Sequence, residues 1–136
     1  MTNRGIYQNE NRGRQLLRFD GFQYGNITPT DIDGHIDYRD HVAVFFEAKL
    51  KGKDVPRGQR IALERLVKDA GCAHKHGIAV IMEHDVSDCT KDIWAVDCRV
   101  REIYTTENMA WRPPKWPIKA KEMADAYINY FVNFKA

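Results

Sequence analysis

The sequence lacks the features that mark several large classes of protein. It has no apolar run approaching the roughly 20 residues that a membrane helix needs. Its polar start, MTNRGIYQNENRGRQ, has no apolar region of the kind found in a secretory signal. It also shows no internal repeat, low-complexity segment or linker. We therefore expect one domain, residues 1–136, with no membrane segment and a cytoplasmic location.

Cysteine is scarce, and the charge is almost balanced. The three cysteines, Cys72, Cys89 and Cys98, are odd in number and form no CxxC pair, which argues against a disulfide framework or a structural zinc site. The chain has 21 basic and 19 acidic residues, a net charge of +2. This charge neither requires nor excludes a nucleic-acid partner, because the local distribution matters more than the sum. A hydrophobic content of 43% suffices for a core without disulfides.

Hydrophobic patterning predicts an α/β protein with a mixed central sheet flanked by helices. The expected elements are a helix over 7–19, strands over 32–38 and 41–50, a helix over 57–70, strands over 77–83 and 93–104, and a helix over 118–134. Strands 41–50 and 77–83 are almost continuously apolar, as in strands buried on both faces, and the helix between them suggests a βαβ unit. The apolar face of the last helix is expected to hold Met123, Ala126, Tyr127, Tyr130 and Phe131.

Charged side chains gather at the two ends of the first predicted hairpin. Because alternate residues of a strand point to the same side, Glu47 and Lys49 project together. Asp31 and Asp33 share a face if their segment is extended, and a neighbouring strand could bring an aspartate beside Glu47. Two carboxylates, with the backbone carbonyl of Ala48, would suit a hard cation such as Mg²⁺ or Mn²⁺. Such a cation activates water and neutralises phosphate charge, so this pattern is suited to hydrolysing a phosphodiester.

This arrangement resembles the PD-(D/E)xK nuclease superfamily. The residues that carry the resemblance are PTDIDG over 29–34, EAK over 47–49, and Gln59 in the helix that follows. The stretch TDIDG…FFEAK is also similar to that of RecU-type Holliday-junction resolvases and of small phage-encoded nucleases. The resemblance covers roughly residues 7–84. It implies a core made of a helix, a three-strand meander, a second helix and another strand.

The resemblance implies a Mg²⁺-dependent deoxyribonuclease in which Mn²⁺ can substitute. Asp33, Glu47 and Lys49 would be catalytic, and Gln59 would support the metal-bound water or contact the substrate. By the same analogy the enzyme cuts branched or structured DNA as a homodimer and serves DNA recombination. If the protein is phage-encoded, it would act in the cytoplasm of the bacterial host.

The resemblance also assigns ligands and DNA contacts. Asp33, Glu47 and the Ala48 carbonyl are the expected metal ligands, and Asp31 is the second choice for the aspartate. Glu10, the acid inside the first predicted helix, is a further candidate ligand. Contacts to the DNA backbone are expected from the basic residues beside the site, which are Lys51, Lys53, Arg57 and Arg60.

Two further segments carry residues that could serve either function or structure. Trp111 and Trp116, which are interleaved with basic residues, could stack on an unpaired base or pack over the hydrophobic core. The trio Cys72, His74 and His76 matches no common zinc spacing, and we interpret it as a surface loop.

The sequence is also compatible with two alternatives to an endonuclease. A non-catalytic module on the same fold, binding nucleic acid or protein, would have no Mg²⁺ or Mn²⁺ site that depends on Glu47. A phage exonuclease or a restriction-like enzyme would keep the site. The chain leaves little room for a target-recognition domain, which argues against sequence-specific restriction.

Overall fold

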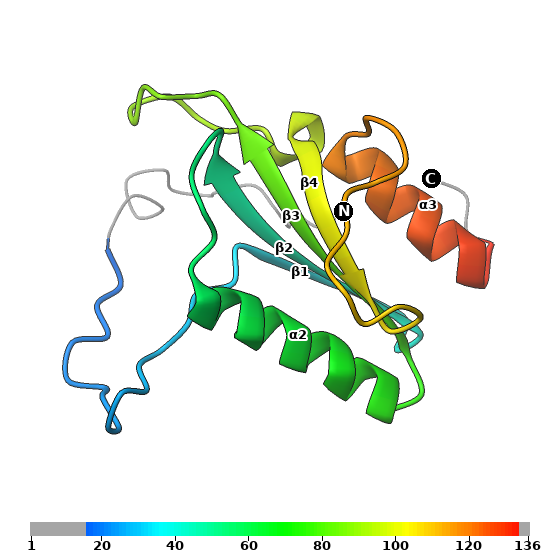
Figure 1. Cartoon of the computed structure of the whole chain (residues 1–136), viewed down its shortest axis with the longest axis horizontal. Coiled ribbons are helices and arrows are strands. Elements are labelled where there is room, and N and C mark those ends of the chain that lie inside the picture. The colour runs from blue at the N-terminus through cyan, green and yellow to red at the C-terminus, as the bar shows by residue number, and fades with distance from the viewer. Residues whose placement is uncertain (1–15, 134–136) are drawn as a thin grey trace, which may run out of the picture.

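The computed structural model describes residues 16–133, which form a four-stranded mixed sheet between two helices (Figure 1). The sheet order is β1-β2-β3-β4, with the central pair β2 and β3 parallel and both outer pairs antiparallel. The elements are β1 (Gly34–Tyr38), β2 (Val42–Leu50), α2 (Arg57–Cys72), β3 (His76–His84), the 3₁₀ helix η1 (Ala95–Asp97), β4 (Arg99–Thr105) and α3 (Ala120–Val132). The predicted α/β class with a mixed sheet flanked by helices is confirmed.

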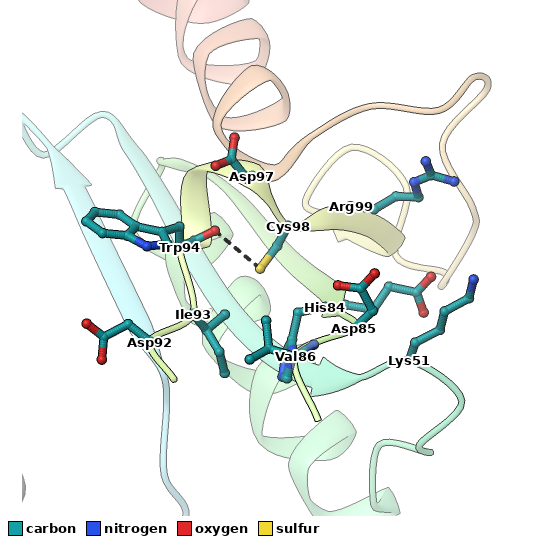
Figure 2. A pocket seen from close by; sticks show the side chains of 11 residues that line it. Lys51, His84, Asp85, Val86, Asp92, Ile93, Trp94, Asp97, Cys98 and Arg99 are labelled. Atoms are coloured by element: carbon teal, nitrogen blue, oxygen red, sulfur yellow. Dashed lines mark hydrogen bonds between the residues drawn. The ribbon is translucent and has the colours of Figure 1, made fainter. Parts of the chain in front are cut away.

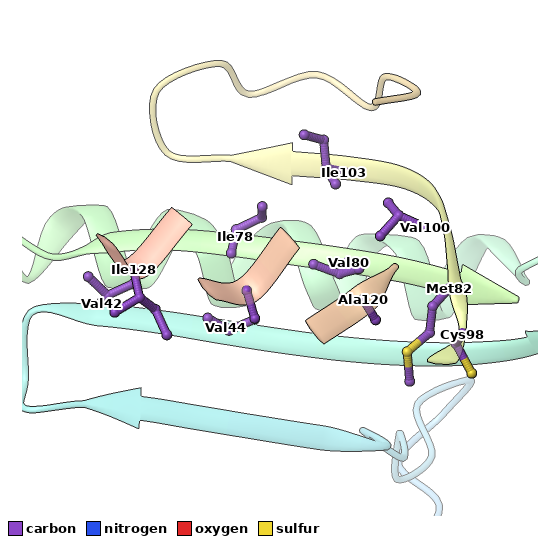
Figure 3. Packing of buried hydrophobic residues seen from close by; sticks show 11 residues of the cluster. Val42, Val44, Ile78, Val80, Met82, Cys98, Val100, Ile103, Ala120 and Ile128 are labelled. Carbon is purple, nitrogen blue, oxygen red and sulfur yellow. The ribbon is translucent and has the colours of Figure 1, made fainter. Parts of the chain in front are cut away.

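One face of the sheet packs against α3. Even-numbered residues of β2 and β3 point to this side, and Figure 3 shows Val42, Val44, Ile78 and Val80 together there. All four are fully buried, which explains why their strands read as nearly continuous apolar runs in the sequence. Ile128 of α3 packs against this cluster.

The opposite face packs against α2. Phe45 of β2 and Ile81 of β3 meet Leu63 and Val67 of the helix in a second buried cluster. The parallel β2–α2–β3 unit that builds this layer has nearly the predicted bounds. Gly77 allows the helix to approach closely, because a Cβ atom there would lie 3.1 Å from the side chain of Ala70.

The hairpin between β1 and β2 turns through two residues with left-handed backbone. Arg39 and Asp40 have φ of 50° and 62°, and the N–H of His41 donates to the carbonyl of Tyr38 at 3.0 Å. This is the geometry of a type I′ turn, whose twist matches that of the strands. Neither residue is a glycine, so part of the steric cost of the left-handed conformation remains.

Relieving this cost at Arg39 gives a test of the turn. Arg39→Asn is expected to raise the free energy of unfolding by roughly 0.5–1 kcal/mol, because asparagine tolerates the left-handed region better than arginine. Urea unfolding measures the change. Arg39→Ala is the matched control, since it removes the same charge without easing the backbone. An equal gain in both variants would contradict the turn assignment.

The predicted strand 93–104 is wrong over its first half. Residues 95–97 form η1, in which the N–H of Asp97 donates to the Trp94 carbonyl at 3.0 Å, and β4 covers only Arg99–Thr105. Trp94 and Val96 are 70% and 50% exposed. The apolar alternation that suggested a strand therefore continues into the core only from Cys98 onward.

The helices also differ from their predicted forms. Of the predicted apolar face of α3, Met123, Tyr127 and Phe131 pack on the core, whereas Ala126 and Tyr130 are exposed. The face is rotated toward Ala120, Ala124 and Ile128, which are buried. The two alanines allow close contact with the sheet, and Ile128 fills the core cluster. Of the predicted helix 7–19, residues 16–19 have no regular structure, and the remainder lies outside the described residues.

The chain before α2 contributes two strands to the described sheet, β1 and β2, where the resemblance implies a three-strand meander. An isolated antiparallel bridge between Tyr24 and Ile27 precedes them. The stretch 111–117 has no regular element, as its prolines predict, apart from one bridge from Arg112 to Ile103. No helix in the described part of the chain is long and apolar enough to cross a membrane.

Candidate metal site

The candidate metal site lies at the carboxyl end of β2, on the side of the sheet that α2 covers. Ala43 and Phe45 belong to the α2-side core. Because alternate residues of a strand share a face, Glu47 and Lys49 continue the same row toward the strand end. Glu47 is only 3% exposed. The strand thus delivers a carboxylate to the edge of an apolar core, where an ionised group needs a partner.

Asp33 precedes β1 and reaches the end of β2. Its Oδ2 accepts a hydrogen bond from the backbone N–H of Ala48, with N···O 2.7 Å. The ring of His35 stacks on Phe45 with centroids 4.8 Å apart, which places the odd-numbered residues of β1 on the α2 side. Asp33 therefore shares this face with Glu47.

The Ala48 carbonyl faces the same edge as Asp33. Within a strand, the N–H and C=O of one residue point to the same neighbouring strand, and the Ala48 N–H points to Asp33. Asp33 is also the aspartate whose charge acts on Glu47. Asp31 is exposed and lines a hollow formed by residues 16–29. The structure thus brings Asp33, Glu47 and the Ala48 backbone together, whereas Asp31 lies beside the hollow and not in this group.

The electrostatics of Glu47 are dominated by its burial. Burial raises the pKa of the Glu47 carboxyl, and the nearby charge of Asp33 raises this pKa further. Lys49 acts in the opposite direction, with its Nζ 3.4 Å from Glu47 Oε1, and does not reverse the shift. Two carboxylates and one ammonium leave an excess of negative charge that a bound cation would offset.

The donor set fits a hard, oxygen-seeking cation. Asp33 and Glu47 supply carboxylate oxygens and Ala48 a carbonyl oxygen. The described residues contain no group of three or more His, Cys, Asp or Glu side chains placed to hold a metal. Two carboxylates nevertheless suffice for Mg²⁺, which keeps several waters and takes further oxygens from substrate phosphates. Gln59, in the first turn of α2, has a buried Oε1 that has no hydrogen-bond partner.

Three of the four basic residues predicted to contact DNA are exposed, and the fourth contacts other residues of the protein. Lys51, Lys53 and Arg57 are exposed. Arg60 is half-buried and is engaged in the structure, because its Nη2 lies 2.5 Å from Oε2 of Glu102 and its guanidinium lies 5.1 Å from the centre of the Trp111 ring. We therefore expect Arg60 to hold α2 against β4 through these contacts.

Sequence reasoning missed an ion pair beside the site. Glu83 lies directly opposite Lys49 in the parallel β2–β3 register, and its Oε2 accepts from Nε of Arg101 at 3.1 Å. Arg101 Nη1 also donates to the Lys53 carbonyl at 2.7 Å. The residue reaches these partners because the β3–β4 register shifts between Ile81 and Met82. Such a bulge leaves no signal in an isolated sequence.

Removing Arg101 should destabilise this end of the sheet. Arg101→Met is expected to lower the free energy of unfolding by about 1–3 kcal/mol, because Glu83 and the Lys53 carbonyl lose their donor in a partly buried position. Chemical denaturation measures the loss. Arg99→Met is the matched control, since Arg99 is exposed and its replacement should change stability little. Equal stability of both variants would contradict the role of Arg101.

Two of the other residues singled out in the sequence, His76 and Trp111, have structural partners. Nδ1 of His76 lies 2.9 Å from Oε2 of Glu107, and its ring stacks on Phe131 with centroids 3.6 Å apart. His76 thus joins β3 to α3, and within residues 16–133 no metal-binding group includes it. The indole N–H of Trp111 donates to Oε2 of Glu64 at 2.8 Å, and Trp111 thereby packs against α2. Trp116 is 67% exposed.

Glu10, the proposed additional ligand, lies outside the described residues. No family model, curated protein or solved structure matches this chain in the three comparisons made with known proteins.

Proposed function

We propose that this protein is a metal-dependent DNA endonuclease that hydrolyses phosphodiester bonds. The observation that carries the proposal is the meeting of Asp33 and Glu47 on one face of the sheet, with the Lys49 ammonium 3.4 Å from Glu47. A buried carboxylate beside a second carboxylate destabilises the folded state, and such pairs are found where they bind a cation. The resemblance to PD-(D/E)xK nucleases supports the same assignment.

Each residue of the site has a proposed role. Asp33, Glu47 and the Ala48 carbonyl would hold Mg²⁺, or Mn²⁺ in its place. When bound, this cation would lower the pKa of a coordinated water and neutralise charge on the scissile phosphate. Lys49 stabilises the negative charge that develops on the phosphate oxygens as water attacks. Gln59, whose Oε1 has no hydrogen-bond partner, orients the attacking water by accepting a hydrogen bond from it.

The substrate and assembly follow from the resemblance to resolvases. We propose branched or structured DNA as the substrate, with a Holliday junction as the first choice and DNA recombination as the process. A homodimer would supply two active sites for paired cuts. The proposed location is the cytoplasm, that of the bacterial host if the protein is phage-encoded.

The test is cleavage by the purified full-length chain. Labelled four-way junctions, splayed duplexes and linear duplexes are incubated with Mg²⁺, with Mn²⁺ and with EDTA. We expect cutting with either metal and none with EDTA. Glu47→Ala and Lys49→Ala should each remove the activity. Undiminished cleavage by both variants, under conditions where the wild type cuts, would overturn the proposal.

The limited ligand set also favours a second candidate, a non-catalytic DNA-binding module on the same fold. Two carboxylates bind a cation more weakly than three or four, and no larger group exists among the described residues. Calorimetric titration with Mn²⁺ separates the two functions. A nuclease should show a site that Glu47→Gln removes, and a binding module should show none.

A further inference from the structure

A cavity of about 370 Å³ lies next to the candidate metal site, where the carboxyl ends of β2 and β3 meet the loop 85–98 (Figure 2). Lys51, on its wall, follows Lys49 by two residues, and its backbone N–H donates to the His84 carbonyl at 2.6 Å. Glu83, also on the wall, lies opposite Lys49 in the sheet register. The cavity and the site therefore share one end of the sheet, as ligand sites in open α/β sheets do.

The lining is mostly polar and charged and includes two aliphatic side chains and one indole. In Figure 2 the side chains of Val86 and Ile93 lie in the middle of the cavity lining, and Trp94 stands at one side. Trp94 is 70% exposed, although a large aromatic ring gains most from burial. Its position is held by the backbone of η1, where Asp97 and Cys98 both bond back toward Trp94. An indole exposed beside a cavity offers a flat surface for stacking.

Two of the four carboxylates around the cavity are already compensated. Glu83 is paired with Arg101 at 3.1 Å, and Asp97 lies 3.4 Å from Nζ of Lys119. These pairs offset half of the negative charge that the lining would otherwise present to an anionic ligand.

The remaining polar groups form a mixed set of donors and acceptors. Lys51 and Arg99 supply cationic donors, and Asp85 and Asp92 supply acceptors of opposite charge. His84 Nδ1 accepts the Val86 N–H at 3.1 Å, so a neutral His84 ring carries its proton on Nε2 and is a further donor. A nucleotide presents the complementary groups: a flat base with donors and acceptors at its edge, and a phosphate.

We propose that this cavity is a subsite for one unpaired nucleotide of the substrate, beside the scissile phosphodiester. The inference rests on the proposed nuclease function. Among the branched substrates proposed for it, the subsite favours DNA with a single-stranded arm over an intact four-way junction, whose arms are all paired. Trp94 stacks on the base, Asp85 and Asp92 accept hydrogen bonds from base amino groups, and Lys51 and Arg99 contact the flanking phosphates. A paired base cannot enter, because its edge and faces are occupied within the duplex.

Binding measured without cleavage tests the subsite. Fluorescence anisotropy in EDTA gives the Kd of the full-length protein for a duplex carrying an arm of about ten unpaired nucleotides, and for the same duplex with blunt ends. Trp94→Ala is expected to weaken binding of the armed duplex about 5- to 100-fold, the range found for loss of one base-stacking contact. Binding of the blunt duplex should stay almost unchanged, because its paired bases cannot stack on Trp94.

Tyr130→Ala is the matched control, because Tyr130 is an exposed aromatic residue, at 83%, and is outside the cavity lining. It should leave both dissociation constants unchanged. An unchanged Kd of Trp94→Ala for the armed duplex, or an equal loss for both DNAs, would overturn the subsite. If the wild type cleaves DNA with Mg²⁺ and Trp94→Ala binds normally, the subsite fails alone. If Trp94→Ala loses arm binding and the wild type never cleaves, the nuclease function fails alone.

Discussion

Glu47→Gln is expected to abolish Mg²⁺-dependent cleavage and to leave the protein at least as stable as the wild type. The amide keeps the shape of the side chain and loses the charge that would hold the cation, so the cleavage rate should fall by about 10²–10³-fold or more. Single-turnover cleavage of the junction substrate measures this loss. Calorimetric titration should show that the Mn²⁺ site has gone as well.

The stability of Glu47→Gln separates a functional residue from a structural one. Burial and the charge of Asp33 both penalise the ionised form of Glu47, and Lys49 compensates only in part. Replacing the carboxylate with a neutral amide removes this penalty. Urea unfolding at neutral pH should therefore give an equal or higher midpoint than for the wild type, as is common where a site is built for function.

Glu83→Gln is the matched control for Glu47→Gln. Glu83 lies in the neighbouring strand on the same side and is paired with Arg101. Its replacement leaves Arg101 without its carboxylate and should lower stability while metal-dependent cleavage continues. A loss of stability in Glu47→Gln would show that the Glu47 charge supports the fold. Persistent cleavage by that variant would show that the charge is not needed for catalysis.

The raised pKa of Glu47 predicts how pH and metal act on the wild type. Because the folded state binds the Glu47 proton more tightly than the unfolded state does, this residue lowers stability as pH rises from about 4.5 through the folded pKa. A cation that binds the ionised pair reverses this loss. The midpoint of thermal unfolding at neutral pH should thus rise on addition of Mn²⁺, and it should not rise in Glu47→Gln.

The parts of the fold that the sequence predicts well are those with a strong local pattern. β2, α2 and β3 have bounds within a few residues of the prediction, because buried strands and an amphipathic helix repeat their apolar residues over many positions. The strand prediction is wrong over residues 93–98, where Trp94, Val96 and Cys98 alternate as in a strand. Their backbone turns at η1 instead, through local hydrogen bonds that hydropathy does not encode.

The candidate site likewise has features that the sequence predicts and features that it does not. The joint projection of Glu47 and Lys49 follows from the two-residue period of a strand, so the sequence alone could place them together. The hydrogen bond from the Ala48 N–H to Asp33 depends on the register of the hairpin between β1, which starts at Gly34, and β2. The contribution of Arg101 depends on a bulge, and the cavity depends on the path of a loop. These are tertiary features, and no single segment of the chain specifies them.

Lys49→Met is expected to have the opposite effect on stability from Glu47→Gln. Lys49 supplies the positive charge nearest to Glu47, with Nζ 3.4 Å from Oε1, in a position where its side chain is 22% exposed and that of Glu47 only 4%. Its removal leaves two adjacent carboxylates uncompensated. We expect a loss of about 1–3 kcal/mol in the free energy of unfolding at neutral pH, below the full cost of a broken buried pair because Lys49 is partly solvated. Cleavage should fall by about 10²–10³-fold.

The pH dependence identifies the cause of this loss. Without Lys49 the pKa of Glu47 rises further, so the deficit should be small near pH 4, where Glu47 is protonated in both states, and should grow as pH increases. Urea unfolding between pH 4 and pH 8 measures the trend, and Lys51→Met, which replaces an exposed lysine, should show none. Adding Glu47→Gln to Lys49→Met should restore most of the lost stability, because the unpaired buried charge is then absent. A deficit that is independent of pH, or that Glu47→Gln leaves in place, would mean that Lys49 acts through the packing of its stem rather than through charge.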